Sequence, residues 1–169
     1  VDPGVVVKDD GTPLSVFTPY FKRWLVKSWE APHATPAPCW ATGLASEPIP
    51  GSPETPHTLP TASEAAAWSR WDAFKSDALD HYADNRNTPA VDGTSMLSPY
   101  LRFGIVHPRQ LLAESEPIES RRTFVSEICW REFYADVLFN KPHTAWENLQ
   151  PKMNVLPHDT GELADARFD

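Results

Sequence analysis

Residues 31–60 carry eight prolines, together with Gly43, Gly51 and several serines and threonines. Proline lacks a backbone donor and breaks helices, and it is excluded from the middle of a sheet. This composition cannot sustain a helix and rarely sustains a strand. The stretch is therefore predicted to be a long extended connector, and regular structure must lie on either side of it.

Helical signals flank the connector. Thr18 and Pro19 are placed as N-cap and first residue of a short helix. Thr61 and Glu64 have the capping-box spacing and predict the start of a longer helix that ends before Thr88. Its apolar residues recur every three or four positions, which is typical of a core-facing stripe: Trp68, Trp71, Phe74, Ala78, Leu79 and Tyr82.

The second half of the chain also favours helices. Ser98 and Pro99 repeat the cap-and-proline start, and Gly104 marks a stop within about one turn. His107–Pro108 starts another helix, and a long one is predicted over about 120–139. Apart from a possible strand at residues 5–7, no alternating pattern is present. The predicted fold class is mainly α.

Composition limits the possible partners. The net charge of −8 and pI near 5.2 argue against broad attraction to phosphate backbones, so any nucleic-acid contact must be local. With a mean hydropathy of −0.43 and no long apolar run, no membrane partner is expected. The lack of a signal peptide pattern favours a cytoplasmic location. The first residue is Val and the last segment has no helix-ending Gly or Pro, so a fragment is expected.

Common catalytic and metal-binding motifs are absent from the sequence. The six histidines show no metal-ligand spacing, and there is no CxxC or HExxH, so no metal site is expected. GxSxG, Walker and GxGxxG motifs are also missing. Cys39 lies in the connector and Cys129 in an apolar helical pattern, which does not suggest a disulfide framework.

The segment Thr94–Ser98 places three hydroxyls just before a predicted helix start: Thr94, Ser95 and Ser98. Unpaired backbone N–H groups and the helix dipole favour an anion at such a position. A phosphate or pyrophosphate would fit there. The alternative is an ordinary serine N-cap with neighbouring hydroxyls in a turn.

A second cluster falls within the long predicted helix. Glu127, Trp130, Arg131 and Tyr134 stand at i, i+3, i+4 and i+7, so their side chains share one face. An indole that stacks, a carboxylate that accepts and a guanidinium that pairs with an anion suit a flat, hydrogen-bonding ligand. The alternative is an exposed Glu127–Arg131 ion pair beside a partly buried tryptophan.

Four blocks together resemble the helical flavin-binding domain of the photolyase and cryptochrome family: residues 16–20, 82–86, 94–104 and 127–134. The similarity is greatest to bacterial class I cyclobutane pyrimidine dimer photolyases. It implies that residues 1–30 end an N-terminal domain and begin the connector, 31–60 are the interdomain connector, and 61–169 are the first part of the helical domain. Met96 departs from the arginine common in the family's Thr-Ser-Arg-Leu-Ser motif.

The resemblance also implies roles for individual residues. Positions expected to contact FAD are Tyr82, Thr94, Ser95, Leu97, Ser98, Phe124 and Arg131. Positions expected along the DNA are Arg86, Glu127, Trp130, Arg131 and Tyr134. Glu127 and Trp130 would be the catalytic pair that lines the pocket for a flipped pyrimidine dimer, Trp130 by stacking and Glu127 by hydrogen bonding.

The implied reaction is light-driven DNA repair, in which reduced FAD donates an electron to the dimer and regains it. The expected partner is UV-damaged DNA, the full-length protein is expected to be a monomer, and an antenna chromophore would bind outside this chain. The isolated chain is expected to be inactive. Two alternatives stay open: a cryptochrome that signals blue light, and a helical interaction module without a ligand. Glu at position 127 favours repair of cyclobutane dimers, because the family's other branches usually carry Gln there.

Overall fold

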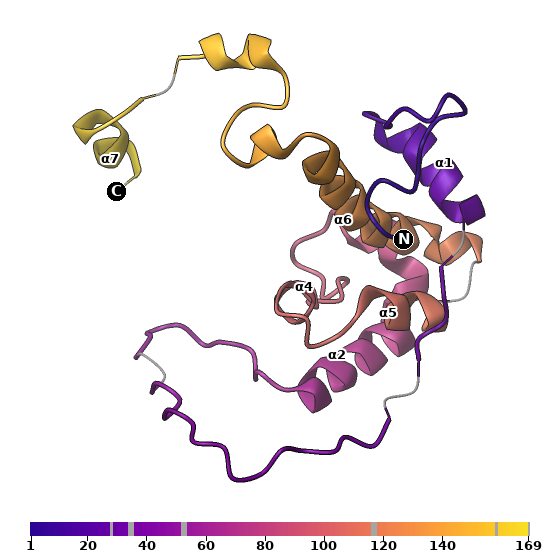
Figure 1. The fold of residues 1–169 in the computed structure, drawn as a ribbon, viewed down its shortest axis with the longest axis vertical. Helices are drawn as coiled ribbons and strands as arrows, with labels where there is room; N and C mark the ends of the chain where they lie inside the picture. The colour runs from indigo at the N-terminus through magenta and orange to yellow at the C-terminus, as the bar shows by residue number, and fades with distance from the viewer. Residues whose placement is uncertain (28, 34–35, 52–53, 116–117, 158, 169) are drawn as a thin grey trace. The chain divides into compact units, whose positions relative to one another are not determined.

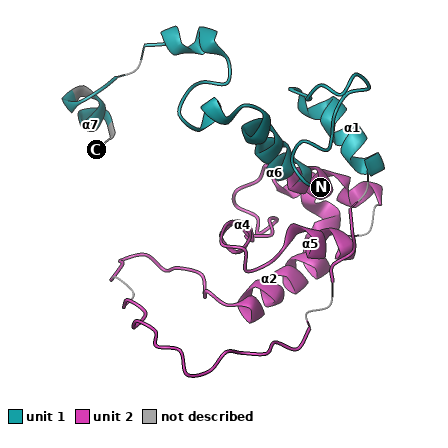
Figure 2. Ribbon diagram, in the orientation of Figure 1, with its two compact units in different colours: residues 1–28, 129–169 teal, residues 29–128 magenta. Residues whose placement is uncertain are grey.

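A computed structural model describes nearly the whole chain: residues 1–27, 29–33, 36–51, 54–115, 118–157 and 159–168. The chain forms two compact units, which Figure 2 shows in different colours. Unit 1 consists of residues 1–28 and 129–169, and unit 2 of residues 29–128. The described residues form helices and one isolated β-bridge, Val7–Pro13, but no strand. The predicted mainly α fold class is confirmed.

Unit 2 contains a succession of short helices, which Figure 1 shows in magenta to orange: α2 (Glu64–Asp77), 3₁₀-helix η1 (Leu79–His81), α3 (Tyr82–Asn85), α4 (Ser98–Arg102), α5 (Pro108–Glu114), 3₁₀-helix η2 (Glu119–Arg121) and residues 122–128 of α6 (Arg122–Asn140). Helix η1 packs against η2. Arg121 joins them by donating from Nε to Asp80 Oδ1 at 2.7 Å.

The core of unit 2 is built on aromatic rings. Trp71 and Phe74 of α2 are buried and pack against Phe124 of α6, with ring centroids 5.5 and 5.3 Å from it. The Trp71 Nε1–H donates to Glu114 Oε2 at 2.9 Å, and Lys75 reaches the same oxygen at 2.5 Å. Helix α2 is thus joined to α6 by apolar contacts and to α5 by polar ones.

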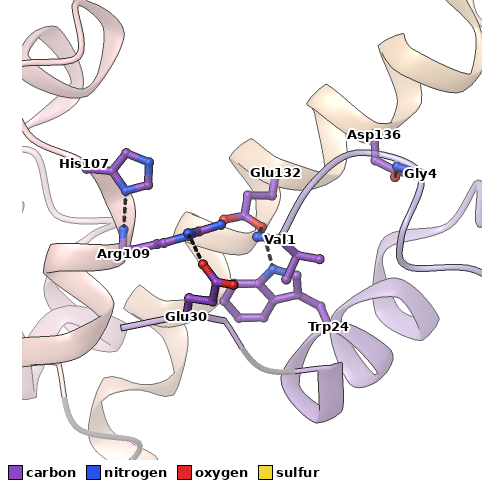
Figure 3. A network of polar contacts seen from close by, with 8 residues as sticks. All are labelled: Val1, Gly4, Trp24, Glu30, His107, Arg109, Glu132 and Asp136. Atoms are coloured by element: carbon purple, nitrogen blue, oxygen red, sulfur yellow. Dashed lines mark hydrogen bonds and ion pairs between the residues drawn. The ribbon is translucent and has the colours of Figure 1, made fainter. Parts of the chain in front are cut away.

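Unit 1 combines α1 (Phe17–Lys27), residues 129–140 of α6, 3₁₀-helices η3 (Pro142–Ala145) and η4 (Pro151–Val155), and α7 (Glu162–Phe168). Trp24 of α1 is fully buried, and its Nε1–H donates to Glu132 Oε2 at 2.7 Å (Figure 3). Asp136 is also fully buried and accepts from the Gly4 amide at 2.6 Å. Helix α1 and the N-terminal segment are therefore joined to α6 through the Glu132 and Asp136 carboxylates, and the buried Asp136 has a donor.

Three predicted helix starts are wrong by one or two residues. Helix α1 begins at Phe17, so Thr18 lies inside its first turn and is not the cap. Helix α2 is capped by Ser63, whose Oγ accepts from the Ala66 amide at 3.1 Å, and not by Thr61. Helix α4 has Leu97 at its N-cap, so Ser98 is the first helical residue. At α2 the Ser63 side chain takes over the capping role, whereas Leu97 at α4 makes no side-chain capping hydrogen bond.

The structure also tests the local predictions for residues 68–82, 5–7 and 31–60. The stripe from Trp68 to Tyr82 is not one helix, because α2 ends at Asp77 and η1 and α3 follow. Residues 5–7 form no strand. The described part of the connector, residues 31–33, 36–51 and 54–60, contains no helix and is exposed throughout. Its role between domains of a longer protein stays a prediction. Among the described residues, no helix has the length and apolar composition required to cross a bilayer.

Candidate functional site

The hydroxyl segment Thr94–Ser98 leads directly into α4. Thr94 and Ser95 are partly exposed, and Ser98 is exposed. The Leu97 side chain is fully buried and anchors the segment in the core, so only its backbone could meet a ligand. Met96 between them has a φ of 52°, in the left-handed region that non-glycine residues rarely adopt. The segment is thus a tight turn that leaves hydroxyls at the surface.

Arg70 of α2 fixes this turn. Its Nη1 and Nη2 donate to the Asp92 carboxylate at 2.9 and 2.6 Å. Nη2 also donates to the Thr94 carbonyl at 2.6 Å, and Nε donates to the Ser95 carbonyl at 3.1 Å. The hydrogen bonds raise the pKa of Arg70 and lower that of Asp92. Sequence reasoning missed both residues, since no local pattern links positions 22 residues apart.

A cavity of about 670 Å³ adjoins the turn. Its lining includes two guanidinium groups, two threonines, a carboxylate and a methionine: Arg70, Arg86, Thr88, Thr94, Asp92 and Met96. The volume is in the range of small-molecule sites. Arg86 and the threonine hydroxyls could donate to an anionic ligand, whereas the donors of Arg70 are largely engaged within the turn.

Four of the predicted site residues meet beside this cavity. The Arg86 guanidinium lies 5.4 Å from the centroid of the Tyr82 ring, and its Nη1 donates to Glu127 Oε1 at 2.5 Å. Tyr82 contacts Phe124 edge to face, with centroids 5.6 Å apart. The bond to Glu127 raises the pKa of Arg86, and burial raises that of Tyr82. Arg86 is therefore a partner of Glu127, a contact that the local sequence pattern did not predict.

The remaining predicted residues of α6 belong to unit 1. The half-buried Trp130 stacks on Phe17 with centroids 3.6 Å apart and planes at 9°. Tyr134 lies on a nearly parallel plane, 5.5 Å from Trp130. Arg131 and Tyr134 are exposed. Phe17 was not expected at the site, although it lies in one of the four blocks that carry the family resemblance.

Unit 2 has a further polar cluster at the start of α5. The His107 Nδ1 accepts from the Arg109 amide at 3.1 Å and caps α5, while the Arg109 guanidinium lies 3.7 Å from Glu30 (Figure 3). Gln110 completes a capping box with the His107 amide at 2.9 Å. These groups have structural tasks at the helix start. Among the described residues, no group of three or more acidic, His or Cys side chains could hold a metal ion.

The sequence is similar to those of several known proteins. No protein-family model matches the chain. The chain is 33% identical to the deoxyribodipyrimidine photo-lyase of Halobacterium salinarum, over 88% of this chain and 35% of that protein. It is 32% identical to the photo-lyase of Alkalihalophilus pseudofirmus, over 96% of this chain and 37% of that protein. The chain is thus similar to deoxyribodipyrimidine photo-lyases over most of its own length.

A third photolyase, from Thermus thermophilus, is 33% identical over 87% of this chain. This chain spans about a third of the length of these photolyases. The family resemblance read from the four sequence blocks is thereby confirmed. The roles of single residues in cofactor and DNA binding stay predictions.

Proposed function

We propose that the full-length protein is a DNA photolyase that uses FAD to split cyclobutane pyrimidine dimers. The observation that carries the proposal is the similarity to several deoxyribodipyrimidine photo-lyases over most of this chain. The arrangement in unit 2 supports it, because the Thr94 hydroxyl and the Arg86 guanidinium line one cavity.

The cofactor phosphates would be held by the hydroxyls of Thr94, Ser95 and Ser98. Arg70 engages the carbonyl oxygens of this turn and therefore leaves the side-chain hydroxyls for a ligand. Tyr82 would line the flavin with its exposed part, while Phe124, only 3% exposed, supports Tyr82 from the core. Reduced FAD, when bound and excited by light, supplies the electron that opens the cyclobutane ring and takes it back.

The damaged bases would meet α6. Flipping a dimer out of the duplex costs a few kcal/mol, which stacking and hydrogen bonds in the pocket must offset. Trp130 offers the stacking surface. Glu127, held by Arg86, offers carboxylate oxygens that accept from the N–H groups of the pyrimidine rings. Exposed Arg131 and Tyr134 would lie along the DNA strand, as would Arg86.

The proposal is tested with the full-length protein, reconstituted with FAD and reduced. Duplexes that carry one cyclobutane dimer or one six-four photoproduct are incubated with it in blue light and in the dark, and intact lesions are counted. We expect loss of the cyclobutane dimer in light alone, and no loss of the six-four lesion. Bound flavin without repair would assign the protein to cryptochrome-type signalling. Failure to bind flavin would refute the proposal and favour an interaction module.

Replacing Glu127 with glutamine should lower the repair yield about fivefold, because a neutral amide oxygen is a weaker acceptor than a carboxylate. FAD content and the thermal unfolding midpoint should stay close to wild type, since the amide can still accept from Arg86. The measurement is the repair yield per absorbed photon. Glu119→Gln, the same change at a side chain that is 89% exposed, is the control and should have no effect. Wild-type repair by Glu127→Gln would remove Glu127 from the catalytic pair.

A further inference from the structure

Arg70 has an unusual set of partners for a helix residue. It makes four hydrogen bonds, and all of them go to residues 92–95. Two reach the Asp92 carboxylate as a fork, and two reach consecutive backbone carbonyls. A guanidinium has five N–H donors in a rigid plane, so this arrangement leaves a single donor for any other partner. Arg70 is therefore committed to the turn and not to a ligand.

The turn requires such support. The buried Gly93 lies so close to α3 that a Cβ there would be 2.4 Å from the Asn85 Cβ. Three residues later, Met96 has its φ of 52°, and its side chain is 64% exposed and offers little packing. A non-glycine residue in the left-handed region persists when contacts around it determine the backbone. The two carbonyls that Arg70 holds, those of Thr94 and Ser95, directly precede Met96.

We propose that Arg70 is a positioning residue that sets the Thr94 and Ser95 hydroxyls for the phosphates of the cofactor. This inference rests on the proposed function, which supplies the phosphate-bearing ligand. Arg70 acts through the backbone: it fixes the carbonyls, the peptide planes follow, and the hydroxyls and amides are aligned before a ligand arrives. Alignment in advance reduces the ordering that binding must otherwise supply. Asp92 holds the guanidinium plane from the opposite end of the turn.

The test compares a ligand with phosphates and one without. The full-length apoprotein is titrated with FAD and with riboflavin, and both dissociation constants are measured from flavin fluorescence. Arg70→Lys keeps the charge but cannot form the planar fork. We expect it to raise the Kd for FAD about tenfold, the size of one lost hydrogen bond to a charged group, and to change the Kd for riboflavin less than about twofold.

Two further variants complete the test. Arg102→Lys makes the same substitution at the exposed end of α4 and should alter neither constant. Asp92→Asn loosens the guanidinium without removing it and should raise the Kd for FAD by a smaller factor, about threefold. Asp92→Asn keeps the inference testable if Arg70→Lys fails to fold.

The outcomes distinguish failure of the positioning role of Arg70 from failure of the proposed function. Unchanged FAD affinity in folded Arg70→Lys would overturn the positioning role, and so would an equal loss of FAD and riboflavin affinity, which indicates a general disturbance of the fold. If the wild-type protein binds riboflavin and FAD equally, the phosphates are not recognised at this turn and the inference fails while a flavoprotein remains. If it binds neither, the proposed function itself is refuted.

Discussion

Replacing Trp130 with alanine should weaken binding of dimer-containing DNA about 30-fold, with the flavin content unchanged. Stacking of a base on an aromatic side chain contributes about 1–3 kcal/mol, and a loss of about 2 kcal/mol corresponds to this factor. Light-driven repair at low enzyme concentration should fall with the affinity. The measurement is fluorescence anisotropy of a labelled duplex with one cyclobutane dimer, in the dark. Trp130→Phe, which keeps a ring, should recover most of the affinity.

A control is required because Trp130 also packs within the protein. Its ring stacks on Phe17 at 3.6 Å, so alanine at position 130 removes an internal contact as well as a surface for bases. Phe17→Ala removes the same stack from the other side and keeps the indole. We expect Phe17→Ala to lower the unfolding temperature but to retain DNA affinity. If it loses as much affinity as Trp130→Ala, the role of Trp130 is packing and not base recognition.

The helices themselves could be predicted from local sequence. The start of α5 at His107–Pro108 and the long helix over about 120–139 agree with α5 and α6, since proline at a helix start and apolar periodicity act over a few residues. The exact cap of α2 could not be predicted, because two hydroxyl residues, Thr61 and Ser63, stand near its start. At α2 the Thr61 carbonyl accepts from the Ser63 amide and from the Tyr100 hydroxyl, and Ser63 becomes the cap.

Much of the candidate site follows from tertiary contacts that the local sequence does not encode. Arg86 donates to Glu127 from 41 residues away, and nothing in the local sequence predicts this contact. Arg70 stands one position before the buried Trp71, outside the apolar stripe, and nothing near it in sequence indicates that it binds residues 92–95. The residue types at the site could be anticipated from the family resemblance. The residues that hold them in place could not.

A second large effect, on stability, is expected from a substitution in α2. Trp71→Ala should lower the free energy of unfolding by about 4 kcal/mol, because truncating a fully buried tryptophan removes apolar contacts and leaves a cavity. Trp71 is 0% exposed and packs against Phe74 and Phe124. The change also removes the Trp71 Nε1–H group that donates to Glu114, although Lys75 still pairs with that carboxylate. The measurement is urea unfolding of the full-length apoprotein, followed by far-UV circular dichroism.

Trp68→Ala is the matched control, since it makes the same substitution in the same helix. Trp68 is only partly buried, and its Nε1–H donates at 3.3 Å to Glu64 within α2, so we expect a loss of about 1 kcal/mol. The two variants share the change in helix propensity, and their difference isolates the core contact. Equal losses would show that Trp71 is not part of a closely packed core. A selective loss in Trp71→Ala should also weaken FAD binding, because Phe124 links the Trp71 ring to Tyr82 at the candidate site.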